Sequence, residues 1–268
     1  MNTFVIAEAG SCHDCSPDKM REMICVAKDA GADACKFQWT SSPERLAARR
    51  HAEDYLEAYR TIAFPAATLL WLKSLCDAGG IEFMVTVYLP EDIAVVAPLV
   101  KRFKIASYEA GDKAFLDAHL AYGKPIIVST GGMTEAELCR LEFWWNDTHP
   151  DQVHLLHCTA SYTAPVEDLS LSLIGGTETH YSGLLGLSDH SGHVLTGALA
   201  AALGAEIIEV HFRLRSTSPH NPDYGHSLDP EQLRQYVANI RFAEAAMGTP
   251  VKRLMPSEER WAKYRVRP

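Results

Sequence analysis

Short apolar runs alternate with longer amphipathic segments along the whole chain. Eight runs rich in Val, Ile, Leu or Phe are predicted to be strands: Phe4–Gly10, Ala34–Trp39, Glu82–Tyr88, Arg102–Ser107, Pro125–Thr130, Val153–Thr159, Leu184–His190 and Glu206–Phe212. The segments between them are predicted to be helices, because they begin at capping residues or prolines and several end at glycine. The expected starts are Ser16-Pro17, Pro65, Pro90, Asp112, Thr134 with Glu137, Asp168 and Asp229-Pro230, and the expected ends are Gly31, Gly79, Gly123, Gly204 and Gly248.

This repeated order of strand and helix predicts a single-domain α/β fold, the (β/α)8 or TIM barrel. Eight units fit the roughly 250 residues that such a barrel needs. The strands are too uniformly apolar to leave one face in water, which is typical of parallel strands covered by helices. No Gly-x-Gly-x-x-Gly motif follows the first strand, so a dinucleotide-binding sheet is not favoured. We expect the barrel over residues 1–250 and a tail or linker over 251–268.

Two stretches interrupt this rhythm. Ser41–Ala63 is highly charged and too long for a plain connection between a strand and a helix, so we expect a lid. Leu214–Ser227 contains prolines, a glycine and two histidines, and it is predicted to be a long loop after the eighth strand.

Composition places the chain among ordinary folded proteins and excludes several functions. Apolar residues make up 47% of the chain and charged residues 22%. The 25 basic and 34 acidic residues give a net charge of −9, the wrong sign for a general nucleic-acid binder. The seven cysteines are odd in number and scattered, which argues against a disulfide framework. No basic leader and no run of about 20 apolar residues is present, so we expect a cytoplasmic protein without a membrane partner.

Polar side chains occur where the predicted strands end. In a TIM barrel the carboxyl ends of the strands carry the chemistry, and polar groups in apolar runs are costly to bury unless they are paired. The residues at these ends are Glu8, Lys36, Gln38, Thr86, Tyr88, Lys104, Ser107, Glu109, Ser129, Thr130, His157, Thr159, Tyr162, Ser188, Asp189, His190, Glu209 and His211. They predict a polar, charged mouth.

Two lysines in this set point to an anion. Lys36 and Lys104 lie in apolar strands, and with Ser107, Ser129 and Ser188 they supply two positive charges and three hydroxyl donors, which suit a phosphate. The alternative is that each lysine pairs with a neighbouring glutamate. We favour the phosphate, because neither lysine has an acidic residue beside it in the sequence.

Two histidines indicate a metal. His190 and His211 end adjacent strands, so their imidazoles are expected to converge on one divalent ion with an open coordination position. The alternative is a structural hydrogen bond for each ring. Water and a carboxylate, Glu8 or Asp223, are candidates to complete the ligand set.

A Cys-x-x-Cys pair follows the first strand. Cys12 and Cys15 are compatible with a redox pair or with half of a zinc site. No second pair is spaced to complete a zinc site, so we interpret them as part of an ordinary loop.

Seven ordered blocks, each at a strand end, resemble the catalytic barrel of the N-acetylneuraminate (sialic acid) synthase family, which includes legionaminate and pseudaminate synthases. The blocks are Ile6-Ala7-Glu8-Ala9-Gly10 with His13, residues 31–38, residues 103–107, Gly123-Lys124-Pro125 with Ser129-Thr130-Gly131, residues 156–159, residues 187–190 and residues 209–212. The resemblance implies a transferase that condenses phosphoenolpyruvate with an aldehyde sugar, giving a 3-deoxy-2-ulosonic acid and phosphate. It also implies Mn²⁺ or Mg²⁺ and a homodimer.

The resemblance also implies roles for individual residues. Phosphoenolpyruvate would be held by Lys36, Thr86, Lys104, Ser107, Ser129 and Ser188, the metal by His190 and His211, and the sugar by Gln38, Tyr162 and Asp223. The catalytic residues would be Glu8, Glu109 and Lys104.

The chain departs from the family pattern on the side of the sugar. It has Cys12-His13-Asp14-Cys15 where the family usually has Asn-His-Asn-Gly, and it has Ala160 and Thr163 beside Tyr162. The sequence stops where the family continues into a small antifreeze-like domain, so we expect the barrel alone and an acceptor other than N-acetylmannosamine. Two other functions stay open: a metal-dependent lyase or hydrolase on a phosphorylated or nucleotide-linked sugar, and a non-catalytic sugar-binding paralogue.

Overall fold

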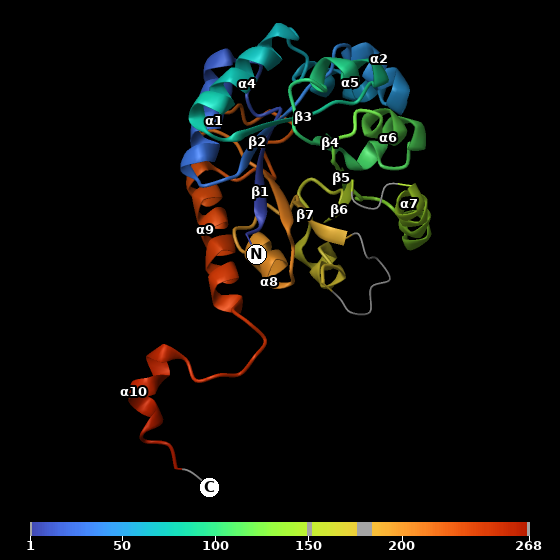
Figure 1. Ribbon diagram of the computed structural model, residues 1–268. Coiled ribbons are helices and arrows are strands. Elements are labelled where there is room, and N and C mark those ends of the chain that lie inside the picture. The colour runs from blue at the N-terminus through green and yellow to red at the C-terminus, as the bar shows by residue number, and fades with distance from the viewer. Residues whose placement is uncertain (1, 149–151, 176–183, 267–268) are drawn as a thin grey trace.

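A computed structural model describes residues 2–148, 152–175 and 184–266 (Figure 1). Eight parallel strands pair in sequence order and close into a barrel, which confirms the predicted fold. The strands are β1 (Phe4–Gly10), β2 (Ala34–Gln38), β3 (Glu82–Thr86), β4 (Phe103–Ile105), β5 (Ile126–Ser129), β6 (Val153–Cys158), β7 (Leu184–Asp189) and β8 (Ile207–His211). Every strand lies within two residues of its predicted bounds at each end.

Helices cover the outside of the barrel. They are α1 (Pro17–Asp29), α4 (Ala67–Gly79), α5 (Pro90–Val96), α6 (Lys113–Leu120), α7 (Glu135–Thr148), α8 (Thr196–Ala202) and α9 (Pro230–Met247). The capping signals act as expected, since the side chains of Ser16, Asp112 and Asp229 each accept a hydrogen bond from a backbone N–H of the first turn.

The prediction of a helix that begins at Asp168 is wrong. Two 3-10 turns, Val166–Asp168 and Leu171–Leu173, take its place in the described residues between β6 and β7. Ser170 stands between them in a left-handed conformation, with a φ of 44°, so the backbone reverses where a helix would have to continue.

The barrel interior has an apolar layer below a polar one. Alternate residues of a strand face the same side, so each apolar residue of the lower layer is followed two positions later by a residue of the upper layer. The lower layer contains Ile6, Ala34, Met84, Ile127, Leu156 and Ile207. Two positions further along are Glu8, Lys36, Thr86, Ser129, Cys158 and Glu209, all buried. The period of two therefore brings the polar strand-end residues into one place.

The charged stretch after β2 folds into α2 (Pro43–Arg50), a 3-10 turn (Glu53–Tyr55) and α3 (Leu56–Arg60). Leu46 and Ile62 anchor it by packing with Tyr88 and Leu89 in a small separate core. It stands at the carboxyl ends of the strands, where the lid was expected. The region 214–227 is a loop with no helix or strand of its own, as predicted.

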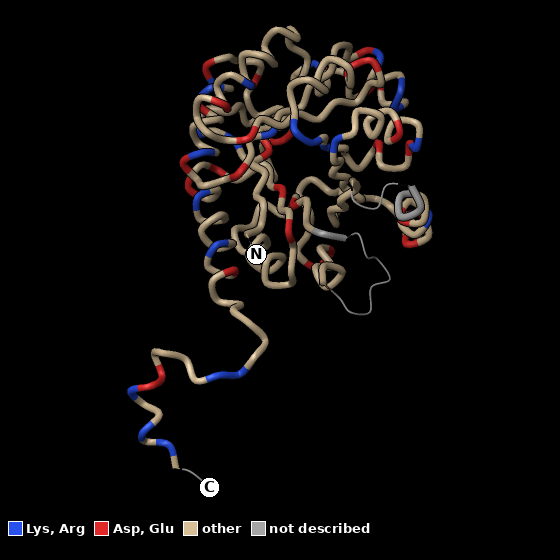
Figure 2. Tube along the Cα trace, in the orientation of Figure 1, with Lys and Arg blue, Asp and Glu red and all other residues tan. Residues whose placement is uncertain are grey.

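After α9 the chain leaves the barrel. A 3-10 turn (Pro256–Glu258) and the short α10 (Glu259–Ala262) lie on an extended arm that projects away from the other helices (Figure 1). Charged residues of both signs are spread over the barrel surface and along this arm (Figure 2). Within the described ranges, no helix combines the length and apolar character that a bilayer crossing requires.

Candidate active site

Lys36 is at the centre of the polar layer. Its Nζ lies 2.8 Å from Glu8 Oε2 and 3.4 Å from Glu209 Oε2, and it donates a hydrogen bond to Thr86 Oγ1 at 2.9 Å. All four side chains are buried. The lysine is therefore held in a fixed position by residues of three other strands, β1, β3 and β8.

Lys104 occupies the adjacent position. Its Nζ donates to Ser129 Oγ at 2.7 Å and to the carbonyl oxygen of Ile105 at 3.0 Å, and it lies 3.5 Å from Glu209 Oε1. The same glutamate oxygen accepts a hydrogen bond from Ser188 Oγ at 3.1 Å. Glu209 thus links the two lysines.

Glutamate partners, the alternative to a phosphate, are present for both lysines, and binding of a phosphate stays a prediction. Both lysines are paired with carboxylates, although no acidic residue is beside either of them in the sequence. The partners come from β1 and β8, which become neighbours only when the barrel closes. Glu209 was therefore missed as a partner, yet its place two residues after Ile207 and two before His211 assigns it to the inner face.

The two glutamates in this cluster differ in how readily they lose a proton. Burial raises the pKa of Glu8 to about 7, and Lys36 only partly opposes this. Burial also acts on Glu209, but Lys104 and Lys36 outweigh it and lower its pKa to about 2. Glu209 is therefore the permanent counter-ion, whereas Glu8 exchanges a proton near neutral pH.

The remaining predicted phosphate ligand lies at the edge of this cluster. Ser107 is half-buried, and its Oγ accepts a hydrogen bond from the backbone N–H of Gly131 at 3.0 Å. The structure therefore brings Lys36, Thr86, Lys104, Ser129 and Ser188 into one connected group, with Ser107 beside it.

A second cluster lies where β8 ends. His211 meets Asp223 and His226 of the following loop, and one donor atom from each lies within 4.8 Å of the others. His190 is adjacent to this group, with its ring centre 5.3 Å from that of His211 and its Nδ1 3.1 Å from the carbonyl oxygen of Thr159. Burial lowers the pKa of His211 and His190 to about 4 and that of His226 to about 3, so all three imidazoles are neutral at pH 7.

These residues suit a divalent metal. His211 Nδ1 and His226 Nε2 are buried and have no hydrogen-bond partner in the described part of the chain. Neutral imidazoles and a carboxylate are the donors that first-row divalent ions prefer. His226 was missed by sequence reasoning, which assigned it only to a loop, because the return of that loop onto β8 leaves no periodic signal.

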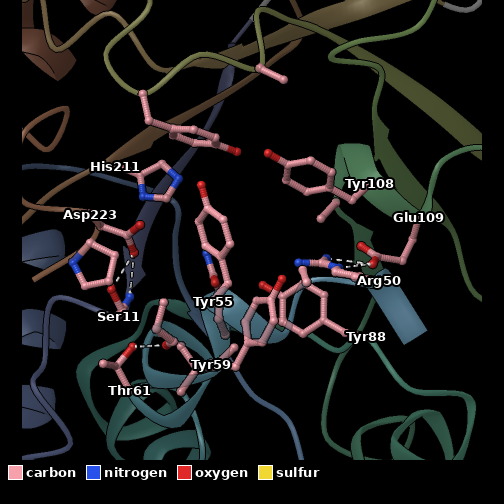
Figure 3. A pocket seen from close by; sticks show the side chains of 18 of the residues that line it. Ser11, Arg50, Tyr55, Tyr59, Thr61, Tyr88, Tyr108, Glu109, His211 and Asp223 are labelled. Atoms are coloured by element: carbon pink, nitrogen blue, oxygen red, sulfur yellow. Dashed lines mark hydrogen bonds and ion pairs between the residues drawn. The ribbon is translucent and has the colours of Figure 1, made fainter. Parts of the chain in front are cut away.

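A pocket of about 900 Å³ opens beside the histidine cluster (Figure 3). Its walls include Gln38, Arg49, Arg50, Tyr55, Tyr59, Tyr88, Tyr108, Glu109, Tyr162, His211, Asp223 and His226. Figure 3 shows Arg50 and Glu109 on the opposite side of the pocket from His211 and Asp223. The segment 41–63 supplies much of one wall.

Glu109 is fixed by Arg50. The Arg50 Nε and Nη2 atoms donate to Glu109 Oε1 at 2.9 and 2.6 Å, and the guanidinium stacks on the rings of Tyr88 and Tyr108 at 4.7 and 4.9 Å. Burial raises the pKa of Glu109, and Arg50 opposes this. Arg50 was also missed, because it comes from the charged segment and not from a strand end.

The three residues assigned to the sugar all line the pocket. Gln38 Nε2 donates to Glu8 Oε1 at 2.9 Å, and the ring of Tyr162 lies 4.5 Å from that of His190. Asp223 Oδ2 accepts hydrogen bonds from the N–H and the hydroxyl of Ser11, each at 2.8 Å. Gln38 and Asp223 therefore link the pocket to the two buried clusters.

Cys12 and Cys15 lie in the loop after β1 as free thiols. Cys12 is buried with its Sγ 3.6 Å from Ser227 Oγ, whereas the Cys15 thiol donates to the carbonyl oxygen of Thr61 at 3.1 Å. Their partners lie in different segments of the chain, so each thiol has its own structural contact.

The NeuB family model matches residues 23–252. The chain belongs to the NeuB family. It is 34% identical over 263 residues to a pseudaminic acid synthase of Campylobacter jejuni, covering 91% of this chain and 75% of the relative. It is 30% identical to an N,N'-diacetyllegionaminic acid synthase of Legionella pneumophila, covering 96% of this chain and 77% of the relative. The expected enzyme class, a synthase of the transferase type, is confirmed by this membership.

Solved structures agree with this assignment. A sialic acid synthetase from Leptospira borgpetersenii is 28% identical and superposes with a TM-score of 0.86, covering 98% of this NeuB chain and 91% of the other. A truncated 3-deoxy-D-arabino-heptulosonate 7-phosphate synthase from Thermotoga maritima has 17% identity and a TM-score of 0.71, covering 93% of this chain and 89% of the other, and shares the fold.

Proposed function

We propose that this NeuB-family enzyme condenses phosphoenolpyruvate with an aldehyde sugar, using a divalent metal and water, and releases a 3-deoxy-2-ulosonic acid and phosphate. The observation that carries the proposal is the pair of buried lysines beside a cluster of neutral histidines. Lys36 is linked to the pocket through Glu8 and Gln38, and His211 and His226 line it. Groups suited to an anion and groups suited to a metal therefore lie near one cavity, which supports the proposal.

Phosphoenolpyruvate binds at the base of this cavity. Lys36 and Lys104 supply charge to its anionic groups, and the hydroxyls of Thr86, Ser107, Ser129 and Ser188 supply hydrogen-bond donors. The ion pairs with Glu209 orient both lysines, and the anionic substrate competes with this carboxylate for them when it binds.

The metal binds at the histidine cluster, through His190 and His211. When bound, Mn²⁺ or Mg²⁺ supplies a Lewis acid for the oxygen of the aldehyde. The buried, unpartnered Nδ1 of His211 supports this assignment.

The reaction forms one C–C bond, adds water and requires proton transfer. The methylene carbon of the enol attacks the aldehyde carbon, water adds to the carbon that carries the phosphate, and phosphate leaves as the C2 ketone forms. Glu8 holds or releases a proton near neutral pH, and Glu109 assists proton transfer from the opposite wall. Lys104 stabilises the charge that develops on the departing phosphate.

The acceptor lies in the outer half of the pocket, against Gln38, Tyr162 and Asp223. The two arginines in this wall are already paired, Arg50 with Glu109 and Arg49 with Asp112 at 2.6 Å. Together with the altered residues after β1, this favours an uncharged aldehyde sugar other than N-acetylmannosamine. We also propose that residues 1–250 act as the catalytic unit with 251–268 as a tail, and that the enzyme is a cytoplasmic homodimer.

The test is phosphate release from phosphoenolpyruvate with Mn²⁺ or Mg²⁺ across a panel of aldoses, with mass detection of products. A product with the mass of aldehyde plus pyruvate establishes the reaction and identifies the acceptor. Lys104→Met is expected to abolish it, whereas Lys101→Met, a control on an exposed lysine at the other end of β4, is expected to retain it. Release of phosphate or pyruvate without an aldehyde would instead indicate a lyase or hydrolase.

A further inference from the structure

Two imidazoles and one carboxylate meet at the end of β8. His211 is the last residue of the strand, and the loop that follows it returns so that Asp223 and His226 face the same point. The ring centres of His211 and His226 are 4.6 Å apart. The loop therefore brings a histidine to the metal-binding cluster that no strand end supplies.

Two nitrogen atoms in this group are buried without a hydrogen-bond partner among the described residues. They are the Nε2 of His226, a residue that is 2% exposed, and the Nδ1 of His211. The nearest acidic oxygen, Asp223 Oδ1, is 3.8 Å from His226 Nε2, too far for a hydrogen bond. Unpartnered buried polar atoms are costly, and a coordinated cation would satisfy both imidazole nitrogens at once.

The backbone beside the group is kept clear of side chains. Gly10 has a φ of 50°, and a Cβ atom at this position would lie 2.3 Å from Asp223 Oδ2 and 3.2 Å from His211 Nδ1. A larger residue would push these two groups apart. Gly10 therefore preserves the spacing that a common ligand needs.

We propose that His226 is a direct ligand of the divalent ion, which it binds with Asp223 in addition to His190 and His211. This set of three imidazoles and one carboxylate leaves coordination positions open, and it favours Mn²⁺ or Co²⁺ over Mg²⁺, which prefers oxygen ligands. The inference rests on the proposed function for the role of the ion, and it moves Asp223 from the sugar contacts to the metal.

The test titrates Mn²⁺ alone into the protein and follows the electron paramagnetic resonance signal of the free ion. His226→Gln keeps the size of the side chain and is expected to weaken Mn²⁺ binding by about tenfold or more. His220→Ala, a control on an exposed histidine of the same loop, is expected to bind as the wild type does. Mn²⁺ affinity in His226→Gln that equals that of the control would overturn the proposal.

A second variant gives a positive signal. In His226→Cys loaded with Co²⁺, a thiolate at a ligand position produces a near-ultraviolet charge-transfer band that the wild type and His220→Cys lack. Absence of this band also counts against the proposal. Neither measurement uses a substrate, so a protein that binds Mn²⁺ through His226 but forms no product refutes the proposed function alone.

Discussion

Replacing Glu209 by glutamine tests how the two buried lysines are held. The carboxylate lies 3.4 Å from Lys36 Nζ and 3.5 Å from Lys104 Nζ, and it accepts a hydrogen bond from Ser188. Glutamine keeps the size and one oxygen acceptor but removes the charge. Because breaking a buried ion pair leaves an uncompensated charge, we expect the free energy of unfolding to fall by about 3–5 kcal/mol.

The same change is expected to strengthen anion binding. The cluster of Glu8, Lys36, Lys104 and Glu209 has two positive and two negative side chains when all are ionised, so the substitution leaves an excess of one positive charge. We expect phosphoenolpyruvate to bind about tenfold more tightly, a gain of about 1.4 kcal/mol. Loss of stability and gain of affinity thus have one cause.

Urea unfolding and calorimetric titration with phosphoenolpyruvate measure the two effects. Glu82→Gln is the matched control, because Glu82 pairs with Arg102 at 2.9 Å away from the pocket. It is expected to cost only about 1 kcal/mol and to leave the affinity unchanged. Unchanged or weaker phosphoenolpyruvate binding in Glu209→Gln would refute the idea that this carboxylate competes with the substrate.

Three further substitutions probe other parts of the structure. Gly10→Ala should cost about 1–2 kcal/mol and weaken Mn²⁺ binding, because of the positive φ and the contact with Asp223; equal urea midpoints and Mn²⁺ affinities for variant and wild type would contradict this. Burial lowers the pKa of His119 to about 4, so its contribution to stability is complete above pH 6.5 and is lost as the pH falls toward 4. We therefore measure by urea how far the free energy of unfolding falls between pH 7 and pH 5. This fall should be about 2 kcal/mol smaller in His119→Gln than in the wild type, and an equal fall in both proteins would argue against the role of His119. Arg50→Lys should raise the KM for the acceptor in steady-state kinetics without changing phosphoenolpyruvate binding, because lysine cannot reproduce the forked contact with Glu109; an unchanged KM would argue against that role.

The strands and the residues they carry could be predicted from the sequence, because both depend on local patterns. The period of two places Lys36 and Ser129 on the inner face, and the rule for TIM barrels places them at the catalytic end. Glu209 as a lysine partner and His226 as a neighbour of His211 could not be predicted in this way. Their contacts depend on barrel closure and on the path of an irregular loop, and neither leaves a periodic signal.

The pocket is lined by two kinds of sequence: residues at the strand ends and the segment 41–63. The ends of β2 and β8 supply Gln38 and His211, whereas one continuous stretch of chain, anchored through Leu46 and Ile62, supplies much of one wall. Substrate choice can therefore diverge in this stretch as long as Arg50 is kept to hold Glu109. Transplanting the stretch between related barrels, with Arg50 retained, is a direct way to exchange acceptor preference while keeping the same reaction.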